Sequence, residues 1–169
     1  MGYIHDTAMS KFLGPEEAQF SAGTWTDSVA TNVWSKNRSA ADAAFVIKIP
    51  IKLNQNSASY KGSKLASINI WYEVATAAMD SVAATIYKAA LPADSAAFAA
   101  PVSQSFTYDT GHDTAAERID VDEHKMTLNL DTPIWLDDDD EAYVELSCDA
   151  AATSVFKYFG ARANFTLRI

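Results

Sequence analysis

The sequence has a single cysteine, Cys148, and three histidines among its 169 residues. One cysteine cannot form a disulfide within the chain. Cys148 lies in phase with Ala142, Val144 and Leu146, so we predict a buried, unreactive thiol. No apolar run is long enough to span a membrane, and no apolar run follows a basic start near the N-terminus, as a signal peptide would require. We therefore expect a chain that folds in a reducing cytoplasm and has no membrane partner.

Basic residues are also scarce. The chain has 13 lysines and arginines against 22 acidic residues, for a formal net charge of −9. The two signs balance through Thr85, so the whole acidic excess lies in the second half. Such a surface repels phosphate backbones and offers no basic stripe that could release counterions. We predict no nucleic-acid partner.

The residues that usually perform catalysis show no recognisable arrangement. His5 and His112 each begin the tetrapeptide His-Asp-Thr-Ala, and His124 stands apart. No Gly-x-Ser-x-Gly nucleophile elbow is present, and the spacing of cysteine and histidine does not suit zinc. We interpret these histidines as turn residues and predict that the protein is not an enzyme, with a hydrolase kept as a third alternative.

Four consecutive aspartates, Asp137, Asp138, Asp139 and Asp140, form the densest acidic run. They cannot lie inside a sheet without a large desolvation cost, so we predict an exposed loop. Calcium is a weaker alternative, because hard cations prefer several oxygen ligands from one loop. No EF-hand spacing is present, and we expect no cofactor.

What the sequence does contain is strict alternation. In Ala43 to Leu53 the side chains of Ile47, Ile49 and Ile51 share one face, and Lys48, Pro50 and Lys52 share the other. This period of two predicts a half-buried strand.

The same alternation recurs to the end of the chain, and we predict that eight or nine of its segments are strands. The further segments are Leu65–Ala75, Val82–Ile86, Val102–Tyr108, Arg118–Val121, Met126–Leu130, a hairpin of Pro133–Leu136 with Glu141–Leu146, Thr153–Phe159, and Ala163–Ile169. No helix alternates with these strands. We predict an all-β, antiparallel β-sandwich that is jelly-roll-like, with an up-and-down barrel as the alternative topology.

Residues 1–42 differ from the rest and are predicted to form an irregular N-terminal arm, with the β-sandwich domain in residues 43–169. A short helical turn is expected at Pro15, Glu16 and Glu17. The arm has too few regularly spaced apolar residues to fold alone. It packs either on its own sheet or on a neighbouring subunit, and we predict the second, a clamp between subunits.

Several aromatic residues lie on the predicted outer faces, namely Trp71, Tyr87, Trp135 and Tyr143. Exposed aromatic rings stack on sugars or anchor protein interfaces. About 30 residues are alanine, and many fall where a monomer would have polar loops. We predict that these loops contact another chain, through an interface that includes Trp25, Trp34, Trp71, Trp135 and Phe98.

Two runs carry a resemblance to a known class of protein, Leu65–Val74 and Ala83–Lys88. They resemble β-sandwich structural proteins of tailed-phage particles, which include capsid decoration and head-fibre proteins. The segment Pro133 to Leu146 also resembles accessory sandwich modules that bind carbohydrate. The resemblance covers roughly Leu65 to Ile169 and implies no catalytic residues.

The resemblance implies a virion structural protein, a decoration (cement) or head-fibre component assembled in the host cytoplasm. It would adhere to copies of itself, as a trimer, and to the major capsid protein or other virion proteins. The alternative is a carbohydrate-binding module of a tail or secreted protein.

Overall fold

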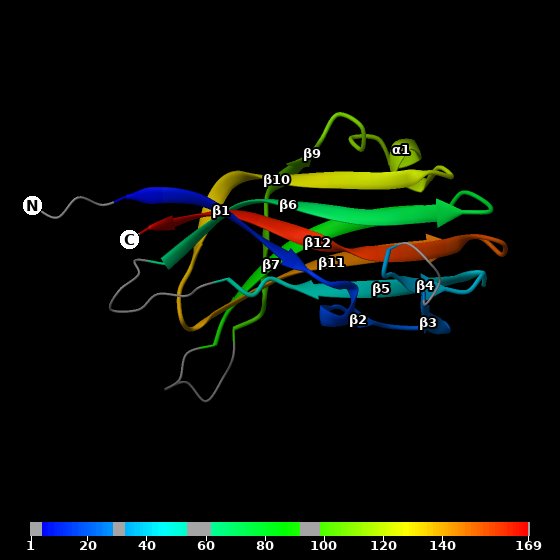
Figure 1. Cartoon of the computed structure of the whole chain (residues 1–169), viewed down its shortest axis with the longest axis horizontal. Coiled ribbons are helices and arrows are strands. Elements are labelled where there is room, and N and C mark those ends of the chain that lie inside the picture. Colours follow the sequence, from blue (N-terminus) through cyan, green and yellow to red (C-terminus); the bar gives the residue numbers. More distant parts are fainter. Residues whose placement is uncertain (1–4, 29–32, 54–61, 92–98, 169) are drawn as a thin grey trace, which may run out of the picture.

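The computed structural model describes residues 5–28, 33–53, 62–91 and 99–168. These residues form a two-layer antiparallel β-sandwich of the jelly-roll kind, which confirms the predicted fold class (Figure 1). One sheet has seven strands in the order β3-β4-β12-β6-β10-β9, with β1 also paired to β12. The other has five strands in the order β2-β5-β11-β7-β8.

The elements have the following bounds. The strands are β1 (Asp6–Leu13), β2 (Gln19–Phe20), β3 (Trp25–Asp27), β4 (Lys36–Arg38), β5 (Ala43–Pro50), β6 (Gly62–Ala75), β7 (Ser81–Ala90), β8 (Val102–Gln104), β9 (Phe106–Tyr108), β10 (Glu123–Leu136), β11 (Asp140–Ala150) and β12 (Val155–Arg168). A 3₁₀ turn, η1 (Pro15–Glu17), lies where a helical turn was predicted, and one short helix, α1 (Ala115–Ile119), precedes β10. In the described part of the chain no helix is long and apolar enough to cross a membrane.

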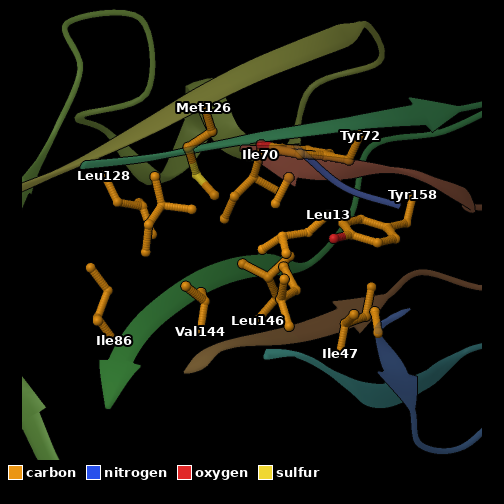
Figure 2. Close-up of a cluster of buried hydrophobic side chains, with 14 of the residues drawn as sticks. Leu13, Ile47, Ile70, Tyr72, Ile86, Met126, Leu128, Val144, Leu146 and Tyr158 are labelled. Atoms are coloured by element: carbon orange, nitrogen blue, oxygen red, sulfur yellow. The ribbon is translucent and has the colours of Figure 1, made fainter. Parts of the chain in front are cut away.

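The core lies between the two sheets and follows the predicted alternation. Ile47 and Ile49 from one sheet face Ile70 and Tyr72 from the other, and all four are fully buried. Figure 2 shows the side chains of Ile47, Ile70 and Tyr72 converging with those of Leu128, Val144 and other labelled residues. Cys148 is buried in the same cluster, as predicted.

The described residues of the N-terminal arm are part of the sandwich. Strands β1 and β4 both pair with β12, along the edge that β6 leaves free. Leu13 and Arg38 have no exposed surface. The structure therefore corrects the description of this arm as irregular, whereas the division at residue 42 stays a prediction.

The predicted strand Val102–Tyr108 is wrong as a single strand. Its first part, β8, pairs with β7 in the five-stranded sheet, and its second part, β9, pairs with β10 in the seven-stranded sheet. The chain thus crosses between the layers at Ser105. Local alternation is compatible with both pairings, so it does not reveal such a crossing.

The predicted hairpin around the four aspartates is also wrong in its pairing. Strand β10 lies in the seven-stranded sheet and β11 in the five-stranded sheet, so the two strands do not share a ladder. The aspartates form the turn that joins the layers, where Asp140 N–H donates to the carbonyl of Asp137 over 3.1 Å. Asp137, Asp138 and Asp139 lie in an exposed turn as predicted, whereas Asp140 begins β11 and is only partly exposed.

The expected strand Arg118–Val121 is replaced by the helix α1. A capping box starts this helix: Glu117 N–H donates to the Thr114 hydroxyl, and Thr114 N–H donates to the Glu117 carboxylate over 3.0 Å. The Thr-x-x-Glu pattern was present in the sequence and is a helix-start signal.

Candidate interaction surface

The outer face of the seven-stranded sheet is shaped by an irregularity in β12. Tyr158 pairs with Tyr72 and Gly160 pairs with Trp71, so Phe159 is an extra residue without a partner on β6. Such a β-bulge bends the strand and re-aims a side chain. Gly160 adopts φ = +123°, a conformation that favours glycine.

Phe12 on β1 packs over this bulge. Its ring centroid lies 6.1 Å from that of Trp71, with the rings tilted by 51°. Arg162, the cross-strand partner of Phe12, places its guanidinium carbon 5.3 Å from the Trp71 ring centroid. Phe12 nevertheless leaves 52% of its surface exposed.

A shallow groove continues from Phe12 toward β4. It has a volume of about 370 Å³ and is lined by Phe159, Trp34, Val33 and the residues of the η1 turn. Trp34 is 53% exposed and Val33 60% exposed. We call Phe12, Trp34, Trp71 and Phe159 the aromatic strip.

The indole of Trp34 lies near the carboxylate of Asp27. This carboxylate forms an ion pair with Lys36. The Lys36 ammonium, with a smaller contribution from Trp34, holds the pKa of the Asp27 carboxyl below its usual range. The exposed apolar part of the Trp34 ring remains available for a partner.

The other predicted interface residues lie elsewhere. Trp25 packs between Phe20 and Phe45, at centroid distances of 4.4 and 5.6 Å, and its indole N–H donates to the carbonyl of Ala22. Trp25 is thus part of the subunit's own structure. Phe98 lies outside the described residues.

Trp135 belongs to a charged end of the same sheet. The guanidinium carbon of Arg168 lies 4.8 Å from its ring centroid and Lys64 Nζ lies 5.7 Å away. Arg168 also makes a two-pronged ion pair with Asp6, at 2.8 and 3.0 Å. The pairing with Arg168 holds the pKa of the Asp6 carboxyl below its usual range. Two cations already contact this indole, in contrast to Trp34.

Tyr87 and Tyr143 lie on the opposite face of the molecule, on the five-stranded sheet. Their centroids are 5.2 Å apart, and Lys48 Nζ lies 5.3 Å from the Tyr143 ring centroid. Lys48 also pairs with Glu145 over 3.5 Å. These aromatic residues and the aromatic strip therefore cannot form one platform.

The four aspartates do not converge on a common point. The Asp140 carboxylate accepts from Asp137 N–H and pairs with Lys88 over 2.8 Å. Within the ranges that the structure describes, no three aspartate, glutamate, histidine or cysteine side chains form a group that could hold a metal ion. The ammonium of Lys88 thus neutralises the charge of Asp140.

The histidines are divided between the two ends of the sandwich. His5 is exposed next to β1, whereas His112 and His124 are buried and contact each other. The hydrogen-bond partners of this buried pair are Asp109, Asp120 and each other, and a serine or threonine hydroxyl is not among them in the described structure. The arrangement therefore lacks the nucleophile of a hydrolytic triad.

Sequence reasoning found Trp34 and Trp71 but missed Phe12 and Phe159. The available signal was the Phe159-Gly160 break inside an otherwise regular strand, which is typical of a bulge. Phe12 carried no comparable signal, because its position depends on the pairing of β1 with β12.

Comparison with known proteins identifies no family. No family model matches the chain, and no curated protein does. Among solved structures, a family 11 carbohydrate-binding module from Clostridium thermocellum, in complex with a β-1,3-1,4-mixed-linked tetrasaccharide, is 11% identical with a TM-score of 0.33. That match covers 96% of this chain and 89% of the other.

Proposed function

We propose that the protein is a structural component of a tailed-phage particle, of the decoration or head-fibre type, which acts by adhesion between protein subunits. The observation that carries the proposal is the aromatic strip. Three neighbouring apolar side chains, Phe12, Val33 and Trp34, are each more than half exposed and line one groove. Clustered exposed apolar residues mark interaction surfaces, whereas single ones are ordinary.

The occupant we propose for the groove is a second copy of the chain, in a trimer. Interfaces between copies are enriched in aromatic residues, methionine and arginine. The strip has Arg162 beside Trp71. The resemblance of residues 65–74 and 83–88 to virion sandwich proteins supports the particle as the setting.

The test compares substitutions in the strip with matched exposed residues outside it. Phe12→Ser and Trp34→Ser should each shift the mass measured by light scattering from about three times 18.3 kDa toward 18.3 kDa. Truncating an interface anchor costs roughly 2 kcal/mol or more, or about 30-fold in affinity. Val102→Ser and Val121→Ser are the controls, because these side chains are 62% and 54% exposed elsewhere.

A wild-type chain that stays monomeric at high concentration would contradict adhesion between copies. Co-purification with virus-like particles tests the setting separately. The protein should remain with assembled particles and be lost from them in the Trp34→Ser variant.

Carbohydrate binding is the second candidate, and one observation favours it. Polar side chains adjoin Trp71 on the outer face of the sheet, where Asn164 donates from its amide to Ser67 and to Asn69 over 3.1 and 3.3 Å. Sugar sites combine an aromatic ring with such hydrogen-bonding groups.

Tryptophan fluorescence separates the two candidates. Under adhesion, emission shifts to the red on dissociation and does not respond to added glycans. A glycan-dependent shift that Trp71→Ala abolishes while assembly stays intact would favour carbohydrate binding instead.

A further inference from the structure

Two buried histidines stand in line between two acidic residues at one end of the sandwich. Nε2 of His112 lies 3.3 Å from Nδ1 of His124, and the two residues are only 8% and 7% exposed. The outer nitrogen of His112, Nδ1, lies 3.1 Å from both carboxylate oxygens of Asp109. The outer nitrogen of His124, Nε2, lies 3.1 Å from the carbonyl oxygen of Asp120 and 3.5 Å from its carboxylate.

The hydrogen-bond partners of the two histidine rings set the number of protons that the ring nitrogens carry. The carbonyl of Asp120 can only accept, so the outer nitrogen of His124 must carry a proton. Both carboxylate oxygens of Asp109 lie at the outer nitrogen of His112, and one of them also accepts from Thr127 N–H over 2.8 Å, so the geometry assigns a proton to this nitrogen too. One further proton is needed between the inner nitrogens, where one ring donates and the other accepts.

We propose that His112 and His124 hold three ring protons between them, and thus one shared positive charge, and that this count makes the end of the sandwich sensitive to pH. If the four ring nitrogens carry only two protons, one nitrogen lone pair faces an acceptor. If they carry four protons, two N–H groups oppose each other and two positive charges are buried side by side. Both states lose a hydrogen bond in a site where little water can replace it.

The charged groups around the pair suit a single positive charge. Asp109 and Asp120 flank it, and Glu117 of α1 is near enough to His112 for the imidazole to contribute to a lowered pKa of the glutamate, whose main cause is hydrogen bonding to Thr114. Arg118 supplies the opposing charge and donates to the carbonyl of His112 over 2.7 Å. A second charge on the histidines would be repelled by this guanidinium.

Two tyrosines face His124 and Arg118 from the neighbouring strands. Tyr72 of β6 stacks on His124 with centroids 4.5 Å apart and donates its hydroxyl to the Arg118 carbonyl over 2.9 Å. Burial raises the pKa of Tyr72, so this phenol stays protonated. Tyr108 of β9 lies 4.3 Å from the Arg118 guanidinium carbon.

The segment that the pair secures closes the end of the core. Residues 109–122 join β9 to β10 through α1. Arg118 reaches across the sandwich to the carbonyl of Val82, and Met79 N–H donates to the carbonyl of Ile119. Loss of the contact between the histidines would therefore loosen this segment from Tyr72 and Met79.

The pH dependence follows from the proton count. When the segment opens, both imidazoles become exposed to solvent, and a solvated imidazole is half protonated near pH 6.5. Below that pH the open state binds two protons and the closed state one, so acid favours opening. Above it the open state binds none, so alkali favours opening too. The closed state is most stable near pH 6.5. Well away from this pH, the ratio of closed to open molecules falls by about tenfold per pH unit on either side.

Hydrogen exchange and NMR of the full chain test the proposal. Protection factors of amides in residues 112–122 should peak near pH 6.5 and fall by at least tenfold by pH 4.5 and by pH 8.5. In the wild type, imidazole ¹⁵N spectra at pH 6.5 should show three N–H protons on the two rings. This second measurement needs no variant.

Matched substitutions assign the effect to the pair. His124→Gln should replace the peak by a monotonic profile, because only one titrating ring remains, whereas His5→Gln should leave the peak unchanged. Two N–H protons at pH 6.5, or a protection profile without a maximum in the wild type, would overturn the proposal. So would an unchanged maximum in His124→Gln.

Discussion

The ring of Phe12 lies directly on the backbone of Gly160. A β-carbon at Gly160 would lie 2.8 Å from the Cζ atom of Phe12 and 2.6 Å from the carbonyl oxygen of Leu13. The missing side chain thus lets β1 pack against the bulge and places Phe12 beside Trp71.

Gly160→Ala is therefore expected to destabilise the protein and displace Phe12. The positive φ alone costs about 1–3 kcal/mol for a residue with a β-carbon, and the clash with a carbonyl oxygen adds to it. Urea unfolding measures the loss. Gly111→Ala is the control, since its β-carbon would meet its nearest neighbour at 3.9 Å. Similar losses in both variants would show that the bulge does not need glycine.

The alternation along β6 predicts a sharp contrast between adjacent residues. Ile70 is fully buried between Met126 and Ala161, its partners on the flanking strands. Ile70→Ala should cost roughly 2–5 kcal/mol, the usual range for a large-to-small core substitution. Asn69→Ala on the outer face loses one hydrogen bond, worth about 1 kcal/mol. Equal melting shifts would contradict the register.

Cys148 should be unreactive in the folded protein. It is 3% exposed, and burial raises the pKa of its thiol. The unfolded chain releases this proton near pH 8.5, whereas the folded chain retains it. Stability from this group is thus complete below that pH and falls as the pH rises above it. A thiol reagent at pH 8 should label Cys148 only at the rate of unfolding. Rapid labelling under native conditions would contradict its burial.

Deleting residues 1–42 should unfold the subunit. The deletion removes β1 and β4 from the edge of β12, and Leu13 from the core. This expectation replaces the clamp predicted from sequence, under which the remaining sandwich would stay folded and lose only its assembly. Circular dichroism and light scattering on residues 43–169 decide between them. A folded, monomeric fragment would support the clamp.

Much of the fold was accessible from the sequence because strand alternation is a local signal. The period of two assigned Ile47, Ile49, Ile70 and Val144 to inner faces, and all four are buried. The aspartates had to form a turn because four charges cannot be desolvated together. The candidate surface was accessible only in part, through Trp34 and Trp71.

By itself, the sequence determined that this protein is an all-β sandwich and which side of each long strand faces its core. Only the tertiary structure decided which strands pair, and thereby that β10 and β11 lie in different sheets and that β1 completes the edge of β12. It also decided that Phe12 meets Trp71 and that His112 meets His124. The physical reason is that alternation depends on each residue's own side chain, whereas pairing depends on backbone groups that are the same in every strand. Which strands become neighbours is therefore settled by contacts between residues far apart in the chain.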